Sequence, residues 1–176
     1  YTGQRPHLII SHLSRLKLDP NREIVEAAQG DPQAEIAWNE FHGFLTTATA
    51  TVTAQHGRGL LLDIHGHSHP IDRLELGYAL TAASLALPDS TLNDPAIIDT
   101  TTIRSLASQP GAYFPEILRG TTSLGGLLQS AGFDSLPSPV FPDPAGNPYF
   151  TGGYIVRQHG SRDAGTVDAI QIESPF

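Results

Sequence analysis

Gly59-Leu60-Leu61-Leu62-Asp63-Ile64-His65-Gly66-His67-Ser68-His69-Pro70 joins an apolar run of strand length directly to a loop that carries three imidazoles. We predict an interior strand over residues 60–64, because a short continuous apolar run followed by turn residues is typical of a buried strand. In α/β enzymes, ligands commonly bind at the carboxyl end of such a strand. The stretch therefore predicts an α/β fold with a candidate site just after Ile64.

The histidines of this loop indicate a metal site. Neutral imidazole is the commonest metal ligand in proteins, and we take His65, at the exit of the strand, as the main candidate. Asp63 can bind the metal or orient the ring of His65 from behind. His67 and His69 alternate with His65, so in an extended segment all three point to one side, and they are weaker candidates. The alternative is a histidine-rich surface loop that binds no metal.

Composition bounds the remaining possibilities. With 176 residues and 39% hydrophobic content, the chain suits a single domain over residues 1–176. A formal net charge of -8, with ten Lys and Arg, argues against nucleic acid or an anionic membrane as partner. Cysteine and methionine are absent, so a chain that begins at Tyr1 is expected to be processed, and this favours secretion.

The elements expected around the histidine loop suggest a parallel arrangement. Residues 6–11 are predicted to form a short buried strand, and a helix is signalled from Asp31 and Pro32 to about Gly57. A strand, helix, strand order favours parallel pairing through a right-handed crossover. We therefore expect a mainly parallel central sheet flanked by helices.

The rest of the chain supplies shorter elements. Residues 71–80 are expected to form a strand beside the site, with Arg73 and Glu75 as an ion pair. Short helices are expected over 81–87, 99–108 and 123–131, and a proline-rich irregular loop over 136–149.

Two further segments carry candidate site residues. The turn signal before Asn21 and Arg22 places both in a loop or at a helix start, where a guanidinium can bind a carboxylate with two parallel hydrogen bonds. The alternative is a surface pair of Arg22 with Glu23 or Glu26. Residues 167–173 alternate strictly, so Gln171 and Glu173 share one strand face, which suits either an active-site wall or a solvated edge.

Asn21-Arg22, Asp63-Ile64-His65, Gly152-Gly153-Tyr154 and Gln171-Ile172-Glu173, in this order, resemble the N-formylglutamate amidohydrolase family. The resemblance runs from about Pro6 to Glu173 and implies a zinc-peptidase-like (phosphorylase/hydrolase-like) α/β fold. The family's first zinc motif, a histidine followed by glycine-rich sequence and an acidic ligand, has no counterpart before Pro6. The resemblance therefore implies that the chain is the larger, C-terminal part of an amidohydrolase-like domain, incomplete at its N-terminus.

By this resemblance, His65 is a zinc ligand, Asn21 and Arg22 hold a substrate carboxylate, and Glu173 is the general base. The implied reaction is zinc-dependent hydrolysis of a C–N amide bond in a small N-acyl or N-formyl amino acid or a peptide-like substrate, with one zinc ion. Residues 63–68 also resemble the first metal motif of polymerase-and-histidinol-phosphatase-like phosphoesterases. That motif opens a barrel needing roughly 200 residues or more, which the remaining chain does not supply.

Two other functions stay open because the upstream zinc motif is missing. The first is a non-catalytic binding protein that uses the same pocket or the acidic surface to hold a ligand or a partner. The second is one fragment of a nicked enzyme, held together with an N-terminal partner fragment by non-covalent packing.

Overall fold

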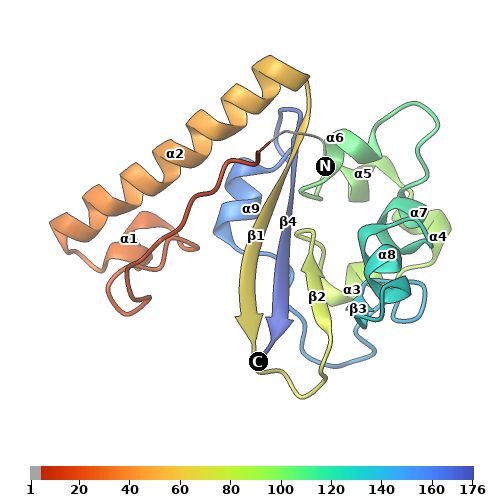
Figure 1. Ribbon diagram of the computed structural model, residues 1–176. Coiled ribbons are helices and arrows are strands. Elements are labelled where there is room, and N and C mark those ends of the chain that lie inside the picture. Colours follow the sequence, from red (N-terminus) through yellow and green to blue (C-terminus); the bar gives the residue numbers. More distant parts are fainter. Residues whose placement is uncertain (1–4) are drawn as a thin grey trace.

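The computed structural model describes residues 5–176 and shows a four-stranded sheet surrounded by helices (Figure 1). The two longest strands, β1 (Gly59–His67) and β4 (Val167–Pro175), run side by side. The shorter strands are β2 (Leu74–Gly77) and β3 (Ser135–Leu136). The helices are α1 (Ile24–Ala28), α2 (Pro32–His56), α3 (Ala82–Leu85), α4 (Asp89–Leu92), α5 (Pro95–Ile98), α6 (Arg104–Ala107), α7 (Phe114–Arg119), α8 (Leu124–Ser130) and α9 (Tyr154–His159).

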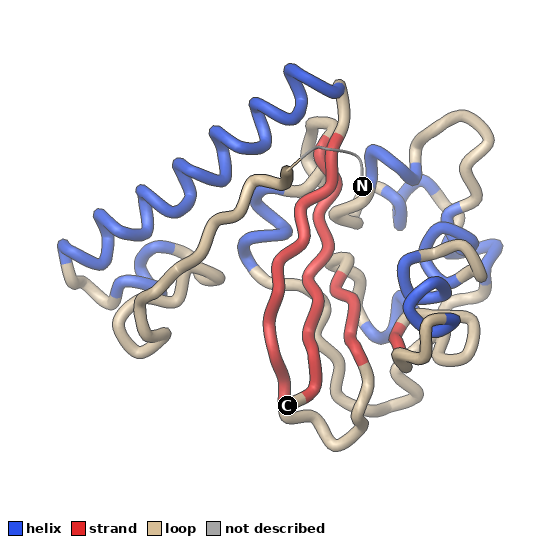
Figure 2. The backbone as a smooth tube through the Cα atoms, in the orientation of Figure 1, coloured by secondary structure: helices blue, strands red, loops and turns tan. Residues whose placement is uncertain are grey.

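The sheet is mixed rather than mainly parallel. Its order is β1-β4-β2-β3, and Figure 2 shows the three longer strands side by side. The pairs β1 with β4 and β2 with β3 are parallel, whereas β2 with β4 is antiparallel. The reversal arises because only a short loop joins β1 to β2, and a parallel crossover needs a dozen residues or more. The expected α/β class is therefore confirmed, and the expected strand direction is wrong for β2.

The long helix α2 follows its local signals. The Asp31 side chain accepts hydrogen bonds from the backbone N–H groups of Gln33 and Ala34, and Pro32 occupies the first turn. Gly57 ends the helix with a φ of 75°, which suits glycine. Threonine hydroxyls in the second half donate to carbonyls one turn earlier, as Thr46 does to His42. No helix within residues 5–176 is long and apolar enough to cross a membrane.

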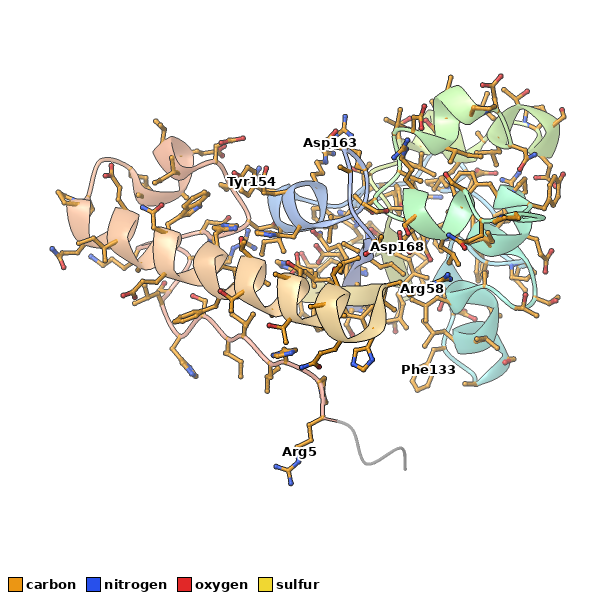
Figure 3. All side chains as sticks on the ribbon, turned by 90° about the horizontal axis from the view of Figure 1, so that it is seen from above. Arg5, Arg58, Phe133, Tyr154, Asp163 and Asp168 are labelled. Atoms are coloured by element: carbon orange, nitrogen blue, oxygen red, sulfur yellow. The ribbon has the colours of Figure 1, made fainter. Side chains whose placement is uncertain are left out.

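The predicted strand over residues 6–11 is not formed. This segment is extended and runs beside α2, with Leu8 79% and Ile10 58% exposed (Figures 1 and 3). Consequently β1 lies at the edge of the described sheet and is not the interior strand that its apolar run predicted. Apolar composition alone does not produce a strand, because the backbone also needs a neighbouring strand for hydrogen bonds.

The main core covers only part of one sheet face. Leu76 pairs with Ile172, and these side chains lie against the apolar cluster that the short helices α3 to α8 contribute. The same face of β1 carries Leu60, Leu62 and Ile64, which are exposed. The opposite face carries Asp63 and His65 of β1 and Gln171 and Glu173 of β4, so the sheet separates its core from the candidate site.

Candidate active site

Three strands bring the polar residues into one row. In the register of the sheet His65 lies opposite Glu173, and Glu173 lies opposite Glu75 on its other side. One row further back, Asp63 lies opposite Gln171. Because residues directly opposite each other project from the same face, these side chains share one surface near the carboxyl ends of β1 and β4. The shared strand face predicted for Gln171 and Glu173 is thus confirmed, and both side chains are buried and not at a solvated edge.

Asp63 and His65 form the closest charged contact of this row. His65 Nε2 lies 2.9 Å from Asp63 Oδ2, and the side chains are only 18% and 11% exposed. This oxygen is nevertheless buried without a hydrogen-bond partner in the described structure, so the contact has the distance of a hydrogen bond but not its alignment. The ring nitrogen of His65 therefore lies next to a carboxylate oxygen of Asp63 that has no hydrogen-bond partner.

The charges of the row shift two pKa values. Burial alone lowers the pKa of His65, but the contact with the Asp63 carboxylate and the charge of Glu173 outweigh it, and the pKa is raised. Burial raises the pKa of Glu173 above its usual range, although the charge of His65 and the hydrogen bond from Gln171 oppose this. Both shifts favour the protonated form of the group, which is the imidazolium of His65 and the neutral carboxyl group of Glu173.

Asn21 links the loop before α1 to the strand wall. Its Nδ2 donates to Gln171 Oε1 at 3.1 Å and lies 3.4 Å from His65 Nε2, while its Oδ1 accepts from the N–H of Ile155 at 2.9 Å. Gln171 Oε1 also accepts from the N–H of Gly153 at 2.7 Å, and its Nε2 donates to Glu173 at 2.6 Å. The amide of Asn21 is thus engaged internally, so its role here is to hold these elements together.

Gly153 is required by this network. A Cβ at position 153 would lie 2.3 Å from the Nδ2 atom of Asn21, far closer than real contacts allow. The Gly152-Gly153 pair that the sequence indicated is therefore a close approach of backbone to the Asn21 amide, followed by the first turn of α9.

Arg22 projects toward solvent at the mouth of the site, with its side chain 53% exposed. Its Nε lies 3.6 Å from both Asp19 and Glu26, so one of the two alternative partners considered for it, Glu26, is present. The Trp38 indole N–H donates to the Arg22 carbonyl at 3.0 Å and anchors its backbone. Because exposed ion pairs are weak, Arg22 can exchange these partners for a bound carboxylate.

His67, His69 and Glu75 form a second cluster beyond Glu173, with ligand atoms within 4.8 Å of one another. His67 uses both ring nitrogens: Nε2 donates to the carbonyl of Arg73 at 2.9 Å, and Nδ1 accepts from the N–H of His69 at 3.0 Å. His69 Nδ1 lies 3.0 Å from Glu75 Oε1. A metal ion here would displace hydrogen bonds that already satisfy His67.

The expected ion pair of Arg73 with Glu75 is wrong. Glu75 is fully buried and binds His69 and the N–H of Phe150 instead. Arg73 lies over the ring of Phe141, 5.9 Å from its centre, and its Nε and Nη2 have no partner among the described residues. The two charges share a strand face, but the loop after β1 brings an imidazole closer to Glu75.

A polar pocket of about 660 Å³ opens in front of this wall. Its volume lies within the range of small-molecule sites. His65, Gln171 and Glu173 line it from the sheet, and the four arginines 15, 22, 157 and 162 line it from the surrounding loops and helices. Within the described structure, the pocket thus brings the predicted base Glu173 and the metal candidate His65 together with four arginines, and Glu23, Glu26 and Asp163 add carboxylates to its lining.

A partly buried pair of histidines, His42 and His159, was not predicted. His42 Nε2 donates to the carbonyl of Pro20 at 3.0 Å, and His42 Nδ1 lies 2.8 Å from His159 Nε2. Burial lowers the pKa of both rings, and the charge of His42 helps to lower that of His159 to about 4. The pair joins α2, α9 and the residue before Asn21. The sequence held no signal for the pairing, because the two histidines lie 117 residues apart in the chain.

Comparison of the chain with protein-family models, with curated proteins and with solved structures finds no match. The resemblance to the N-formylglutamate amidohydrolase family therefore rests on the residues of the site.

Proposed function

We propose that this protein is a zinc-dependent hydrolase that cleaves the C–N amide bond of a small N-acyl amino acid or peptide-like substrate. The observation that carries the proposal is the position of Glu173 directly opposite His65 at the carboxyl ends of two parallel strands, in the wall of a polar pocket that Arg22 also lines. The proposal includes a zinc-peptidase-like fold, with β1 and β4 as its longest parallel pair of strands.

The donor set at Asp63 and His65 fits a zinc ion. A carboxylate oxygen and an imidazole nitrogen 2.9 Å apart, without hydrogen-bond alignment, are arranged as two ligands that share one cation would be. Asp63 is then a ligand instead of a residue that orients His65 from behind. When bound, zinc would supply Lewis acidity, which polarises an amide carbonyl and lowers the pKa of water from 15.7 to about 7.

Glu173 would move the proton during hydrolysis. Gln171 orients its carboxylate by donating to Oε1 at 2.6 Å, and partial burial holds its pKa above the usual range. The carboxylate accepts a proton from the attacking water and passes it to the leaving nitrogen. Arg22 binds the substrate carboxylate at the pocket mouth, and Asn21 keeps the Arg22 loop against the wall.

Turnover of N-formyl-L-glutamate by the zinc-loaded protein tests this function. Glu173→Gln keeps the shape and the hydrogen bond from Gln171 but removes the base, so kcat should fall by about a hundredfold or more. Glu35→Gln, on the exposed side of α2, is the matched control and should retain activity. The proposal fails if zinc-loaded protein hydrolyses neither N-formyl nor other N-acyl amino acids, or if Glu173→Gln is as active as the control.

A non-catalytic binding protein is the second candidate, and the small number of ligands favours it. Within residues 5–176, Asp63 and His65 converge without a third protein ligand, whereas catalytic zinc usually has three. A nicked enzyme would explain the same gap through a partner fragment. Native mass spectrometry separates the two, because a fragment complex exceeds the 18.8 kDa mass of this chain.

A further inference from the structure

The outer edge of β1 faces a groove that continues the candidate active site. The groove has a volume of about 960 Å³ and lies between β1, α2 and the extended segment 5–13. Phe41, Leu45 and Val52 of α2 line one side, and residues 60–65 of β1 line another. Arg15, Asn21 and His65 belong to both the groove and the polar pocket, so the two cavities meet at His65.

The edge itself is open for pairing. In the described part of the chain β1 pairs with β4 alone, so its outward N–H and C=O groups have no strand partner. Leu60, Leu62 and Ile64 are 56%, 47% and 66% exposed beside this edge. Long apolar edges are templates for an added strand unless lysine, proline or a covering element blocks them, and residues 59–66 contain neither lysine nor proline.

The groove has the dimensions of one extended peptide. From Leu60 to His65 the strand rises about 16 Å at roughly 3.3 Å per residue. A volume of about 960 Å³ over this length corresponds to a cross-section of about 60 Å². A strand within stacked sheets takes roughly 4.8 Å by 10 Å, so a single added strand with its side chains fits.

We infer that the substrate is an extended peptide with apolar side chains, which adds to the free edge of β1 and places its scissile amide at His65. This inference rests on the proposed function and names its substrate class. In the reaction the peptide C–N bond breaks, the hydroxyl of water joins the carbonyl carbon, and its remaining proton goes to the nitrogen. The apolar groove thus binds the chain, and the polar pocket receives a carboxylate beyond the cleaved bond.

The open backbone edge favours a peptide over other occupants. A hydrocarbon chain would fill the groove but leave the N–H and C=O groups of the β1 edge buried without partners, which is costly. The segment 6–11 has strand-like composition, but it forms the far wall of the groove with Leu8 and Ile10 exposed. Strand addition satisfies the edge and also buries the three exposed side chains.

The test is calorimetric titration of the zinc-free protein with an acetylated and amidated hexapeptide of alternating leucine and threonine. Two analogues carry N-methyl groups on alternate amides, one set for each edge of the strand. Because alternate amides point to the same edge of a strand, N-methyl groups should weaken binding only when they lie on the amides that face β1. One analogue should bind about tenfold more weakly than the parent, as the loss of one or two net hydrogen bonds implies, and the other should retain binding.

A double variant, Leu62→Lys with Ile64→Lys, places charges beside the edge and should abolish binding. Leu127→Lys on α8 is the matched control, since Leu127 is 56% exposed but lies outside the groove. Circular dichroism verifies that both variants fold. The inference is overturned by equal binding of the two methylated analogues, or by the absence of peptide binding while lauric acid binds. It is equally overturned if sedimentation shows that a second copy pairs through this edge in place of the peptide.

Binding is read without turnover, so the two proposals fail separately. If the protein hydrolyses N-formyl-L-glutamate but does not bind the peptide, the peptide inference is refuted and the proposed hydrolase function stands. If peptide binding depends on Leu62 and Ile64 but no amide is hydrolysed, strand addition at β1 is supported and the proposed hydrolase function is refuted.

Discussion

Glu173 lies directly opposite His65 in the pairing of β4 with β1, and both side chains project from the sheet face opposite the main core. This arrangement places a buried carboxylate and an imidazole beside each other without using the apolar core to support them. The support comes from Gln171 and Asn21, which connect the wall to α9 and to the loop before α1.

The zinc site is expected to depend on Asp63 and His65 together. Protein isolated without an affinity tag should contain about one zinc per chain, as a single site implies. His65→Ala should lose this zinc, and Asp63→Asn should bind it about tenfold or more weakly. Mass-spectrometric metal analysis and competition with a chelator measure both effects. His12→Ala, at an exposed histidine, is the control. Unchanged zinc in the His65 variant would contradict the assignment.

His67 is expected to serve the structure and not the metal. His67→Ala removes the hydrogen bonds to the Arg73 carbonyl and from the His69 N–H, and it empties a buried position. The free energy of unfolding should fall by about 2 kcal/mol, while zinc content stays the same. Urea unfolding and metal analysis on the same sample provide the measurement. Loss of zinc with normal stability would move the metal site to the His67, His69 and Glu75 cluster.

Arg22 is expected to act in substrate binding alone. Arg22→Ala should raise KM for N-formyl-L-glutamate about tenfold or more with little change in kcat, because it removes binding that substrate and transition state share. Arg22→Lys should recover only part of the loss, since an ammonium cannot form two parallel hydrogen bonds. The matched control is Arg104→Ala, an arginine paired with Asp99 away from the pocket. A fall in kcat alone would refute this role.

The close approach of Gly153 to Asn21 predicts that a side chain at position 153 destabilises the protein. Gly153→Ala forces a methyl group against the Asn21 amide and should lower the free energy of unfolding by about 1 to 3 kcal/mol. Gly43→Ala is the internal control: this helical glycine has open space around its Cβ position, so alanine should stabilise by about 0.5 to 1 kcal/mol. Chemical denaturation compares the two. Equal stability of both variants would show that the site tolerates movement of α9.

The His42 and His159 pair predicts loss of stability in acid. Both rings have lowered pKa values when folded, so their contribution is fully present above the unfolded pKa of about 6.5. It declines as the pH falls from there toward the folded pKa of His159, about 4. Urea midpoints at several pH values should therefore drop below pH 6.5. His159→Gln should flatten this dependence, whereas His56→Gln should not, and similar profiles would exclude the pair as the cause.

The sequence by itself determined the elements whose signals are local. The Asp31 cap, Pro32 and Gly57 define α2 because capping and left-handed termination act within a few residues. The strict alternation of residues 167–173 placed Gln171 and Glu173 on one face of β4, since that period follows from strand geometry alone. The residue types after β1 likewise indicated a site at its carboxyl end.

Only the tertiary structure decided which residues meet. The segment 6–11 has the composition of a strand but no partner, so it stays extended and leaves β1 at an edge. Glu75 binds His69 in place of Arg73 because the loop between β1 and β2 brings the His69 ring within 3.0 Å of the carboxylate. His42 and His159 join helices that stand far apart in the chain. Periodicity specifies a face, whereas contacts between distant residues depend on how the whole chain packs.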